Sequence, residues 1–386
     1  MTALASASRE ELDTLRSTVR SYVSDRSPMT SVRELINAGT GYDRRFWQNS
    51  ARELGLAGLT VPPQWGGAGL SAVEVCVVLE ELGRALTMSP YLSVALAVEA
   101  LVQSGDEKAC SDTLPAVSDG SAIVCAVMSD DGGFWNRGNV GVVAENDALG
   151  WRLDGVVSGA IDTWSADTLL MLAQTPDGFG VFLVDTTAPG LTRERLDSLD
   201  LTREMSRLSF TRVPARRVIV GSGFNSYLTR VSSFALAAYV AEMAGVARKC
   251  MEMSVDYAKD RQQFGRPIGS FQAIKHKCAQ MLVSVESIDG ALWKVSRLAA
   301  SNSSEFALFA AIAKAYASEQ CFKVASDNIQ IHGGIGFTWE HDAHLYFRRA
   351  KALQILGGDP SVQRAWIAGQ IGFPFKLIGP GRDQWT

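Results

Sequence analysis

DRQQFGRPIGSFQAIKHK, residues 260–277, is the stretch that says most about the fold. Its glycines and proline are typical of a turn, so we expect one helix to end here and another to begin. Arg261 and Arg266 place two fixed positive charges beside that turn. A guanidinium suits a pyrophosphate because its planar fork donates two parallel hydrogen bonds. Arginines that only solvate a helix end explain the same pattern, and composition alone favours that explanation.

The hydrophobic pattern around this stretch changes twice along the chain. The first third shows apolar residues at helical spacing, and the helical pattern returns after about residue 225, where Phe309, Ile312 and Tyr316 form one apolar stripe. Between these parts lie short runs rich in β-branched or aromatic residues and bounded by turn-forming residues. These runs are residues 121–127, 141–145, 168–175, 178–187 and 207–213.

This order predicts an α+β fold of three parts. The 386 residues exceed what one compact core usually holds, so several structural units are expected. We predict an N-terminal helical domain over 1–119, a middle antiparallel β domain over 120–220 and a C-terminal helical bundle over 221–386.

Composition excludes several classes of function. A net charge of −4 gives no electrostatic reason to expect nucleic acid or an anionic membrane as a partner. The six cysteines include no CxxC pair and are expected to be reduced and packed as small hydrophobes. The start of the chain lacks the features of a signal peptide, and no uncharged apolar run of about 18 residues predicts a membrane span. We therefore expect a cytoplasmic protein.

QIHGGIGFTWEH, residues 330–341, is the second informative stretch. Gly333 and Gly334 allow the backbone to come close to a ligand, and Gln330 both donates and accepts hydrogen bonds. A plain helix-ending turn explains the glycines as well. His332 is expected to be a buried, hydrogen-bonded histidine, and no second ligand at useful spacing predicts a metal.

LYFRRAKALQILGGDPSVQR, residues 345–364, is locally basic. Its cations either solvate a helix face or help to hold an anionic cofactor or the phosphates of CoA. They are Arg348, Arg349, Lys351 and Arg364.

Taken together, the motifs resemble those of the acyl-CoA dehydrogenase family in the same order along nearly the whole chain. RQQFGRPIGSFQAIKHK resembles the RxxFG…FQ segment of that family, and QIHGGIGF resembles its Q-x-x-GG-x-GF segment. VPPQWGGAGLS and the following LEELGRA resemble an N-terminal loop and helix, while FTRVPARRVI resembles the strand and turn that close the β domain. The resemblance implies a helical domain, a β domain and a C-terminal four-helix bundle.

The resemblance also implies FAD as the cofactor and an acyl-CoA thioester as the substrate. The cofactor would be shared across a subunit interface, so we expect a homo- or hetero-oligomer, a dimer of dimers, and an electron-transfer partner. The residues that look like FAD contacts are Arg261, Gln263, Phe264, Gln272, Gln330, Gly333 and Gly334.

The family reaction is α,β-dehydrogenation, for which a carboxylate removes the α-proton. In most members this base is a glutamate near the C-terminus, and Gly357 stands at the matching position. In a second group it lies on an upstream helix, where the matching residue is approximately Ala235. Neither usual carboxylate is present. We expect the paired glycines at 357 and 358 to widen the pocket for a bulky or branched acyl group, such as one derived from a sterol.

Two residues are candidate substitutes for the base. Glu242 lies two helical turns after Ala235 on the same face, about 10 Å along the axis, in an apolar stretch where an unpaired carboxylate is a stronger base. A structural glutamate, bonded to the backbone or to an arginine, is the alternative. Asp359 is the second candidate, although an Asp before Pro-Ser is also typical of a helix start.

The β domain departs from the family pattern. VMSDDGGFW, residues 127–135, matches poorly the segment that covers the flavin, and only Ser129 is a candidate contact there. Three functions follow: an active dehydrogenase with Glu242 as base, a non-catalytic or half-site chain of a heteromeric dehydrogenase, or a flavin monooxygenase of the same fold. The dehydrogenase motifs rank the monooxygenase last.

Overall fold

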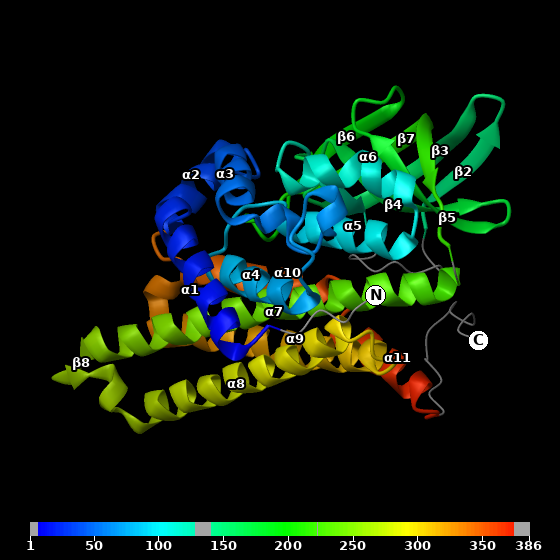
Figure 1. The fold of residues 1–386 in the computed structure, drawn as a ribbon. Helices are drawn as coiled ribbons and strands as arrows, with labels where there is room; N and C mark the ends of the chain where they lie inside the picture. Colours follow the sequence, from blue (N-terminus) through cyan, green and yellow to red (C-terminus); the bar gives the residue numbers. More distant parts are fainter. Residues whose placement is uncertain (1–6, 128–139, 222, 374–386) are drawn as a thin grey trace, which may run out of the picture.

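The computed structural model describes residues 7–127, 140–221 and 223–373. Helices come first, then a sheet, then helices again, which confirms the predicted α+β fold (Figure 1). Ser129 lies outside the described residues.

The N-terminal part is built of helices whose starts are set by local sequence. α1 and α4 each begin with a capping box, in which Ser8 pairs with Glu11 and Ser71 pairs with Glu74. Such a pair satisfies backbone donors that have no partner within the helix. The helices are α1 (Arg9–Arg26), α2 (Met29–Ala38), α3 (Arg44–Leu54), α4 (Ala72–Arg84), α5 (Tyr91–Ser104) and α6 (Glu107–Ser118), with 3₁₀ turns at Leu56–Gly58 and Pro63–Trp65.

Among the described residues of the middle part, seven strands form one sheet with the order β1-β4-β2-β3-β7-β5 and with β6 beside β7. Most neighbours are antiparallel, as expected, but β4 runs parallel to both β1 and β2. The strands are β1 (Val124–Val127), β2 (Val142–Asp147), β3 (Gly150–Ile161), β4 (Thr168–Thr175), β5 (Gly178–Asp185), β6 (Leu191–Leu196) and β7 (Met205–Val218). Figure 1 shows this sheet on one side of the long helices, and α5 contacts both β1 and α7.

Between residues 223 and 373, the C-terminal part forms three long helices and two shorter ones. They are α7 (Phe224–Asp260), α8 (Gln272–Ala300), α9 (Phe306–His332), α10 (Ala343–Ile355) and α11 (Pro360–Gln370), and a short hairpin of β8 (Gln262–Gln263) and β9 (Arg266–Pro267) joins α7 to α8.

The core face of α9 consists mainly of small residues. Ala310, Ala313 and Ala317 are buried, whereas Ile312 and Tyr316 are 41% and 38% exposed. The apolar stripe seen in the sequence therefore faces outward at these two positions. Alanines let neighbouring helices pack closely, while the larger side chains remain available for contact with another chain.

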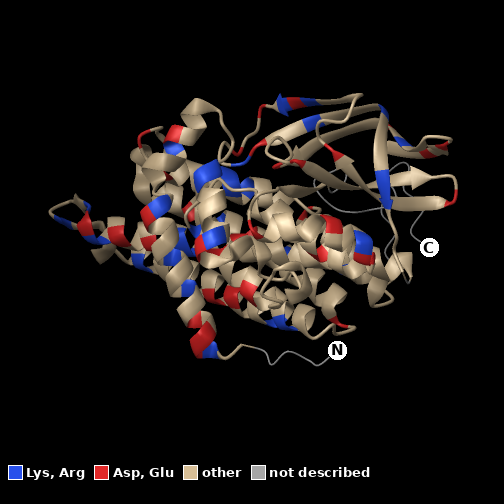
Figure 2. Ribbon diagram, turned by 45° about the horizontal axis from the view of Figure 1, so that its top comes forward, with Lys and Arg blue, Asp and Glu red and all other residues tan. Residues whose placement is uncertain are grey.

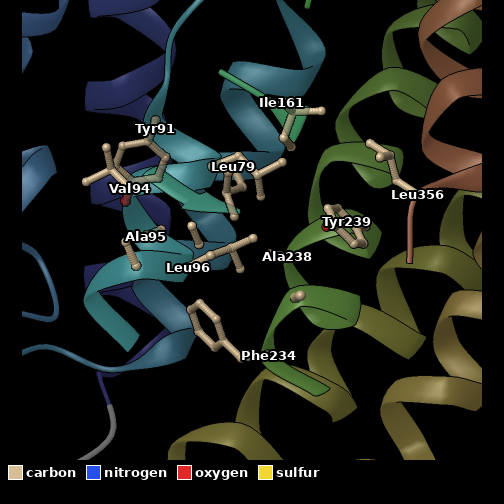
Figure 3. Close-up of a cluster of buried hydrophobic side chains, with 14 of the residues drawn as sticks. Leu79, Tyr91, Val94, Ala95, Leu96, Ile161, Phe234, Ala238, Tyr239 and Leu356 are labelled. Atoms are coloured by element: carbon tan, nitrogen blue, oxygen red, sulfur yellow. The ribbon is translucent and has the colours of Figure 1, made fainter. Parts of the chain in front are cut away.

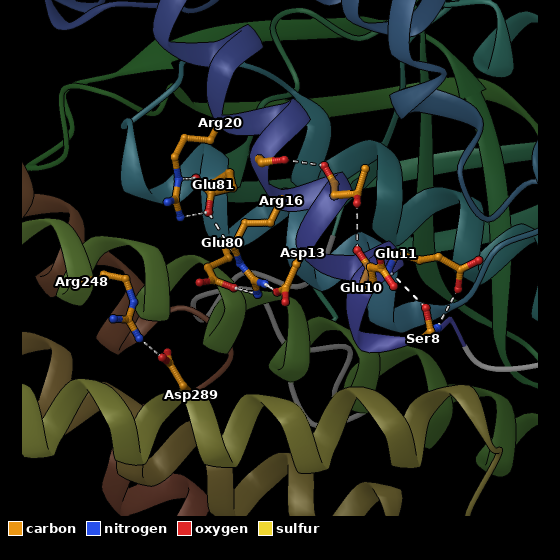
Figure 4. Close-up of polar contacts among 12 residues, drawn as sticks. Ser8, Glu10, Glu11, Asp13, Arg16, Arg20, Glu80, Glu81, Arg248 and Asp289 are labelled. Atoms are coloured by element: carbon orange, nitrogen blue, oxygen red, sulfur yellow. Dashed lines mark hydrogen bonds and ion pairs between the residues drawn. The ribbon is translucent and has the colours of Figure 1, made fainter.

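α4 and α7 cross with their backbones in close approach. A Cβ at Gly83 would lie 2.6 Å from the Glu242 carbonyl oxygen, and one at Gly245 would overlap the Glu80 carbonyl oxygen. Only glycine fits at such a crossing. On the other side of α4, Glu80 and Glu81 receive Arg16 and Arg20 from α1, which fixes α1 on α4 (Figure 4).

Figure 2 shows positively and negatively charged residues interspersed along the ribbon of the helices and the sheet. This distribution agrees with the small net charge. Within the described ranges, no helix has the length and apolar character needed to span a bilayer.

Candidate functional site

Glu242, a candidate base, lies on α7 in a buried ion pair. Arg203, from the connection between β6 and β7, places its Nη2 atom 2.6 Å from Glu242 Oε1 and 2.9 Å from Oε2. The two side chains are only 6% and 4% exposed. Arg349 Nη1 of α10 lies 3.9 Å from Glu242 Oε2. The carboxylate is therefore paired with an arginine, which is the structural alternative for Glu242, and it is not isolated in an apolar pocket.

Further charges extend this pair into a network where the three parts of the chain meet. Arg349 Nε donates to Asp200 Oδ2 at 2.5 Å, and its Nη2 donates to the Thr202 carbonyl oxygen at 3.0 Å. Asp162, at the end of β3, accepts a 2.7 Å hydrogen bond from Ser93 of α5. Burial raises the pKa of Asp162, against the opposing effect of nearby Arg203. We call Asp162, Asp200, Arg203, Glu242 and Arg349 the junction network.

The junction network is not fully satisfied within the described residues. Arg203 Nη1 is buried and has no hydrogen-bond partner among them. A buried donor without a partner costs free energy, so it is a position where a water or a ligand oxygen would be favourable.

The turn around Gly357 is closed by side chains of α7. Gly357 has φ +74°, and a Cβ added there would lie 2.9 Å from both Leu236 Cδ2 and Tyr239 Cε2. Leu356 beside it is buried, and Figure 3 shows Tyr239 and Leu356 within the buried cluster that includes α7. The missing side chain does not widen a pocket at this wall, contrary to our expectation, because Leu236 and Tyr239 fill the space.

Asp359, the second candidate base, caps α11. Its Oδ1 accepts hydrogen bonds from Ser361 N at 2.8 Å, Val362 N at 3.0 Å and Ser361 Oγ at 2.6 Å. The Ser361 hydroxyl, with the Val362 amide next, lowers the pKa of Asp359. Hydrogen bonds that favour the ionised form make it a weaker proton acceptor. The helix-start alternative is therefore the arrangement that the structure shows.

The cofactor candidates of the first stretch lie on and beside the β8–β9 hairpin at one end of the long helices (Figure 1). Arg261 directly follows α7, and Gln263 pairs with Arg266 across the hairpin. Phe264 at its tip has φ +54° and is 90% exposed. Gln272 begins α8 and is also exposed. The hairpin thus presents an arginine, two amides and an aromatic ring outward.

The second group of cofactor candidates lies at the same end of the bundle. His332, the last residue of α9, packs its ring 4.4 Å from that of Tyr257, one turn before the end of α7. Gln330, Gly333 and Gly334 are exposed, and a Cβ added at either glycine would meet no atom within 4 Å. The two segments form what we call the cofactor rim: exposed donors around an open glycine turn, a set that fits a diphosphate.

His332 itself is buried and hydrogen-bonded, as expected. Its Nδ1 donates to the Asn328 carbonyl oxygen at 2.8 Å. Burial lowers the pKa of His332, so the ring is neutral at neutral pH.

The cations of residues 345–364 are engaged within the chain. Arg349 belongs to the junction network, and Arg348 donates to the Leu199 carbonyl oxygen at 3.3 Å. Lys351 bonds Gln354 Oε1 at 2.7 Å, and Arg364 pairs with Glu319 at 2.5 Å. They do not gather into one phosphate-binding cluster.

Sequence reasoning missed three members of the junction network: Asp162, Asp200 and Arg203. No local signal marks them, because each lies at a strand end or in a connection and meets its partner only in the folded chain. A buried arginine needs a buried carboxylate, but the sequence does not show which charges are buried.

Comparisons with known proteins agree with these motifs. The family model "Acyl-CoA dehydrogenase, N-terminal domain" matches residues 9–121, and "Acyl-CoA dehydrogenase, C-terminal domain" matches residues 221–372. The chain is 33% identical over 362 residues to acyl-CoA dehydrogenase IpdE2 of Mycolicibacterium smegmatis, covering 94% of this chain and 99% of that protein. It is 38% identical over 308 residues to acyl-CoA dehydrogenase FadE34 of Mycobacterium tuberculosis, covering 79% of this chain but 39% of that protein.

Two solved structures share the fold. A variant of the Tcur3481–Tcur3483 steroid ACAD has a TM-score of 0.85 at 31% identity, covering 94% of this chain and 98% of that chain. The ChsE4–ChsE5 complex from Mycobacterium tuberculosis has a TM-score of 0.86 at 26% identity, covering 97% and 100%.

Proposed function

The chain belongs to the acyl-CoA dehydrogenase family, and on that basis we propose that it is one chain of a hetero-oligomer that dehydrogenates a steroid-derived acyl-CoA. In this proposal a second chain of the same family carries the base, and this chain contributes to the FAD site. One structural neighbour is a steroid ACAD, and the name of each of the two neighbours described above joins two proteins. The matched part of FadE34 is less than half of that protein, which leaves room for a second unit in one polypeptide.

The observation that carries the proposal is the state of Gly357 and of the two candidate substitutes for the base. Gly357 has no side chain and is closed by α7, Glu242 is held by Arg203, and Asp359 caps a helix. A general base needs an unoccupied acceptor within reach of the proton. A partner's carboxylate meets this need.

This chain's contribution is to hold the cofactor at the cofactor rim. Arg261 would donate to the diphosphate with its guanidinium fork, while Gln263, Phe264 and Gln272 would contact the same end of FAD. Gln330 and the backbone at Gly333 and Gly334 would line the opposite side. When bound, FAD supplies the two-electron oxidising chemistry.

Exposed apolar side chains on the outer faces of α8 and α9 support assembly with another chain. Leu282, Val283 and Trp293 are 47%, 66% and 47% exposed, and Ile312 and Tyr316 add to them on α9. Large apolar groups at helix surfaces are typical of an interface.

The second candidate is a homo-oligomer with Glu242 as base. The unpartnered Arg203 Nη1 favours it, because a donor beside a carboxylate would donate a hydrogen bond to the thioester oxygen and stabilise enolate charge. This function requires Glu242 to accept a proton while Arg203 stays beside it.

The test compares the chain expressed alone with the chain co-expressed with other acyl-CoA dehydrogenase-family chains of its source organism. We expect bound FAD only in a co-purified complex. A steroid-side-chain acyl-CoA should bleach that FAD under anaerobic conditions, and butyryl-CoA should be much less effective. A yellow, active homo-oligomer that loses activity on Glu242→Gln would replace the proposal with the second candidate.

Within the active complex, Arg261→Ala tests the cofactor rim. Loss of charge-assisted hydrogen bonds should weaken FAD binding by about ten- to a hundredfold. Lys259→Ala is the matched control, because Lys259 is an exposed cation two residues away whose partner is Asp256. Equal FAD affinity in both variants would remove Arg261 from the site.

A further inference from the structure

Lys314 of α9 is a fully buried cation. Among the residues that the structure describes, no carboxylate lies within ion-pair distance of its ammonium. Burying an ammonium is costly unless it is paired or fully hydrogen-bonded. The fold therefore has to provide acceptors for it.

Three acceptors surround Lys314 Nζ, and two of them belong to the connection between α10 and α11. Nζ donates to the Gln354 carbonyl oxygen at 3.2 Å, to the Gly358 carbonyl oxygen at 3.1 Å and to Ser318 Oγ at 3.0 Å. The Gln354 carbonyl lies in the last turn of α10, where the helix dipole favours a positive charge.

The same connection is held on its other side by α7. A Cβ at Gly357 would contact Leu236 and Tyr239, so the turn has no free space in that direction. Asp359 then fixes the start of α11. The turn is thus held between α7 on one side and the Lys314 ammonium of α9 on the other.

We infer that Lys314 is a positioning residue that fixes the Gly357–Gly358 turn against α7. The turn stands where most relatives would carry the base, so its importance for the acyl site rests on the proposed function. Its effect on the turn does not. Without the ammonium, the carbonyl oxygens of Gln354 and Gly358 lose this donor, and the turn is free to move away from Leu236 and Tyr239.

Burial and the neighbouring groups act on the pKa of Lys314 in opposite directions. Desolvation lowers the pKa of Lys314 to about 7, and the Asp359 carboxylate and the Cys321 thiol act in the opposite direction. From α10, Lys351 contacts the Gln354 side chain, and from α7 the uncharged Met243 sulfur contacts Ser318.

Hydrogen exchange at pH 6.5 tests the inference without requiring turnover. Lys314→Met keeps the unbranched stem and removes the ammonium, while Lys314→Gln keeps two N–H donors. We expect amides of residues 355–359 to exchange at least tenfold faster in the Met variant and less so in the Gln variant, with α5 unchanged. Lys323→Met is the control on the same helix, since Lys323 is about half exposed and pairs with Asp327.

Wild-type exchange at residues 355–359 in the Met variant would overturn the inference. So would equally faster exchange in all helices, because that result indicates general destabilisation and not a local clamp. If the Met variant does not fold, the Gln variant decides, because its amide nitrogen is one bond shorter in reach and offers two hydrogens to the three acceptors of the ammonium. Exchange there equal to wild type overturns the inference, and locally faster exchange supports it. FAD content and activity of the complex are measured separately, so failure of the proposed function is distinguishable from these outcomes.

Discussion

The junction network and the cofactor rim carry charge in opposite ways. At the junction, charged side chains from distant parts of one chain are buried and meet their partners within that chain. At the cofactor rim, Arg261 and the hairpin are exposed, and the glycine turn is open. Apart from Arg203 Nη1, the buried charges of the junction find partners within the chain, whereas the candidate cofactor residues lie outside. This contrast fits the proposed assembly with a second chain.

The largest expected effect comes from breaking the junction. Arg203→Met leaves Glu242 buried without its partner, which typically costs about 3–5 kcal/mol in the free energy of unfolding. Arg207→Met, on β7 and about half exposed beside Glu194, should change it by less than about 1 kcal/mol. Urea denaturation of both variants gives the comparison. A loss below about 1 kcal/mol for Arg203→Met would mean that the junction does not hold the three parts together.

A smaller effect is expected at the crossing of α4 and α7, which carries Glu242. Gly245→Ala forces a Cβ against the Glu80 carbonyl oxygen and within 2.6 Å of Arg84 N, so the helices must separate. Overpacking of this kind costs about 1–3 kcal/mol.

Gly290→Ala on α8 is the matched control for that crossing. Its Cβ would meet no atom within 4 Å, and alanine is the better helix former by about 1 kcal/mol. Thermal melts should therefore shift in opposite directions for the two variants. Melting temperatures lowered equally would show that the close approach at Gly245 has no particular cost.

The order of the parts could be predicted from sequence because it depends on local pattern. Runs such as 168–175 have the composition of a strand, and β4 occupies that range. β3 and β6 were missed. β3 contains Gly155 and Gly159 and shifts register at two places in its pairing with β7, so its residues do not alternate as those of a regular strand do.

The environment of the candidate base could not be predicted in the same way. Arg203 and Glu242 are 39 residues apart, and Arg349 reaches Asp200 across 149 residues. The orientation of the α9 stripe could not be predicted for a related reason, since helical spacing shows that Ile312 and Tyr316 share a face but not whether that face is inside. The RQQFG and HGG segments were recognisable because their chemistry lies within short stretches.

The smallest effect, and the finest comparison of interior with surface, is the pH dependence of stability. The folded pKa of Lys314 is about 7, below its ordinary 10.5, so the unfolded chain binds more protons between those values. Stability therefore rises with pH across that window.

Glu204 acts in the opposite direction. Burial, with Asp162 nearby, raises the pKa of Glu204 to about 7 from 4.5. The folded chain therefore binds more protons from pH 4.5 to about 7, and stability falls as the pH rises through that range. Each slope is at most about 1.4 kcal/mol per pH unit.

Comparing wild type with a variant that lacks one titratable group isolates the contribution of that group to the pH dependence of stability. Between pH 7.5 and 9, the stability of wild type relative to Lys314→Met should rise by up to about 1 kcal/mol per pH unit, because only the wild type releases the Lys314 proton when it folds. Between pH 5 and 6.5, the stability of wild type relative to Glu204→Gln should fall as the pH rises. Urea midpoints at four pH values suffice, and parallel curves for wild type and Lys314→Met would mean that the buried ammonium does not titrate in this range.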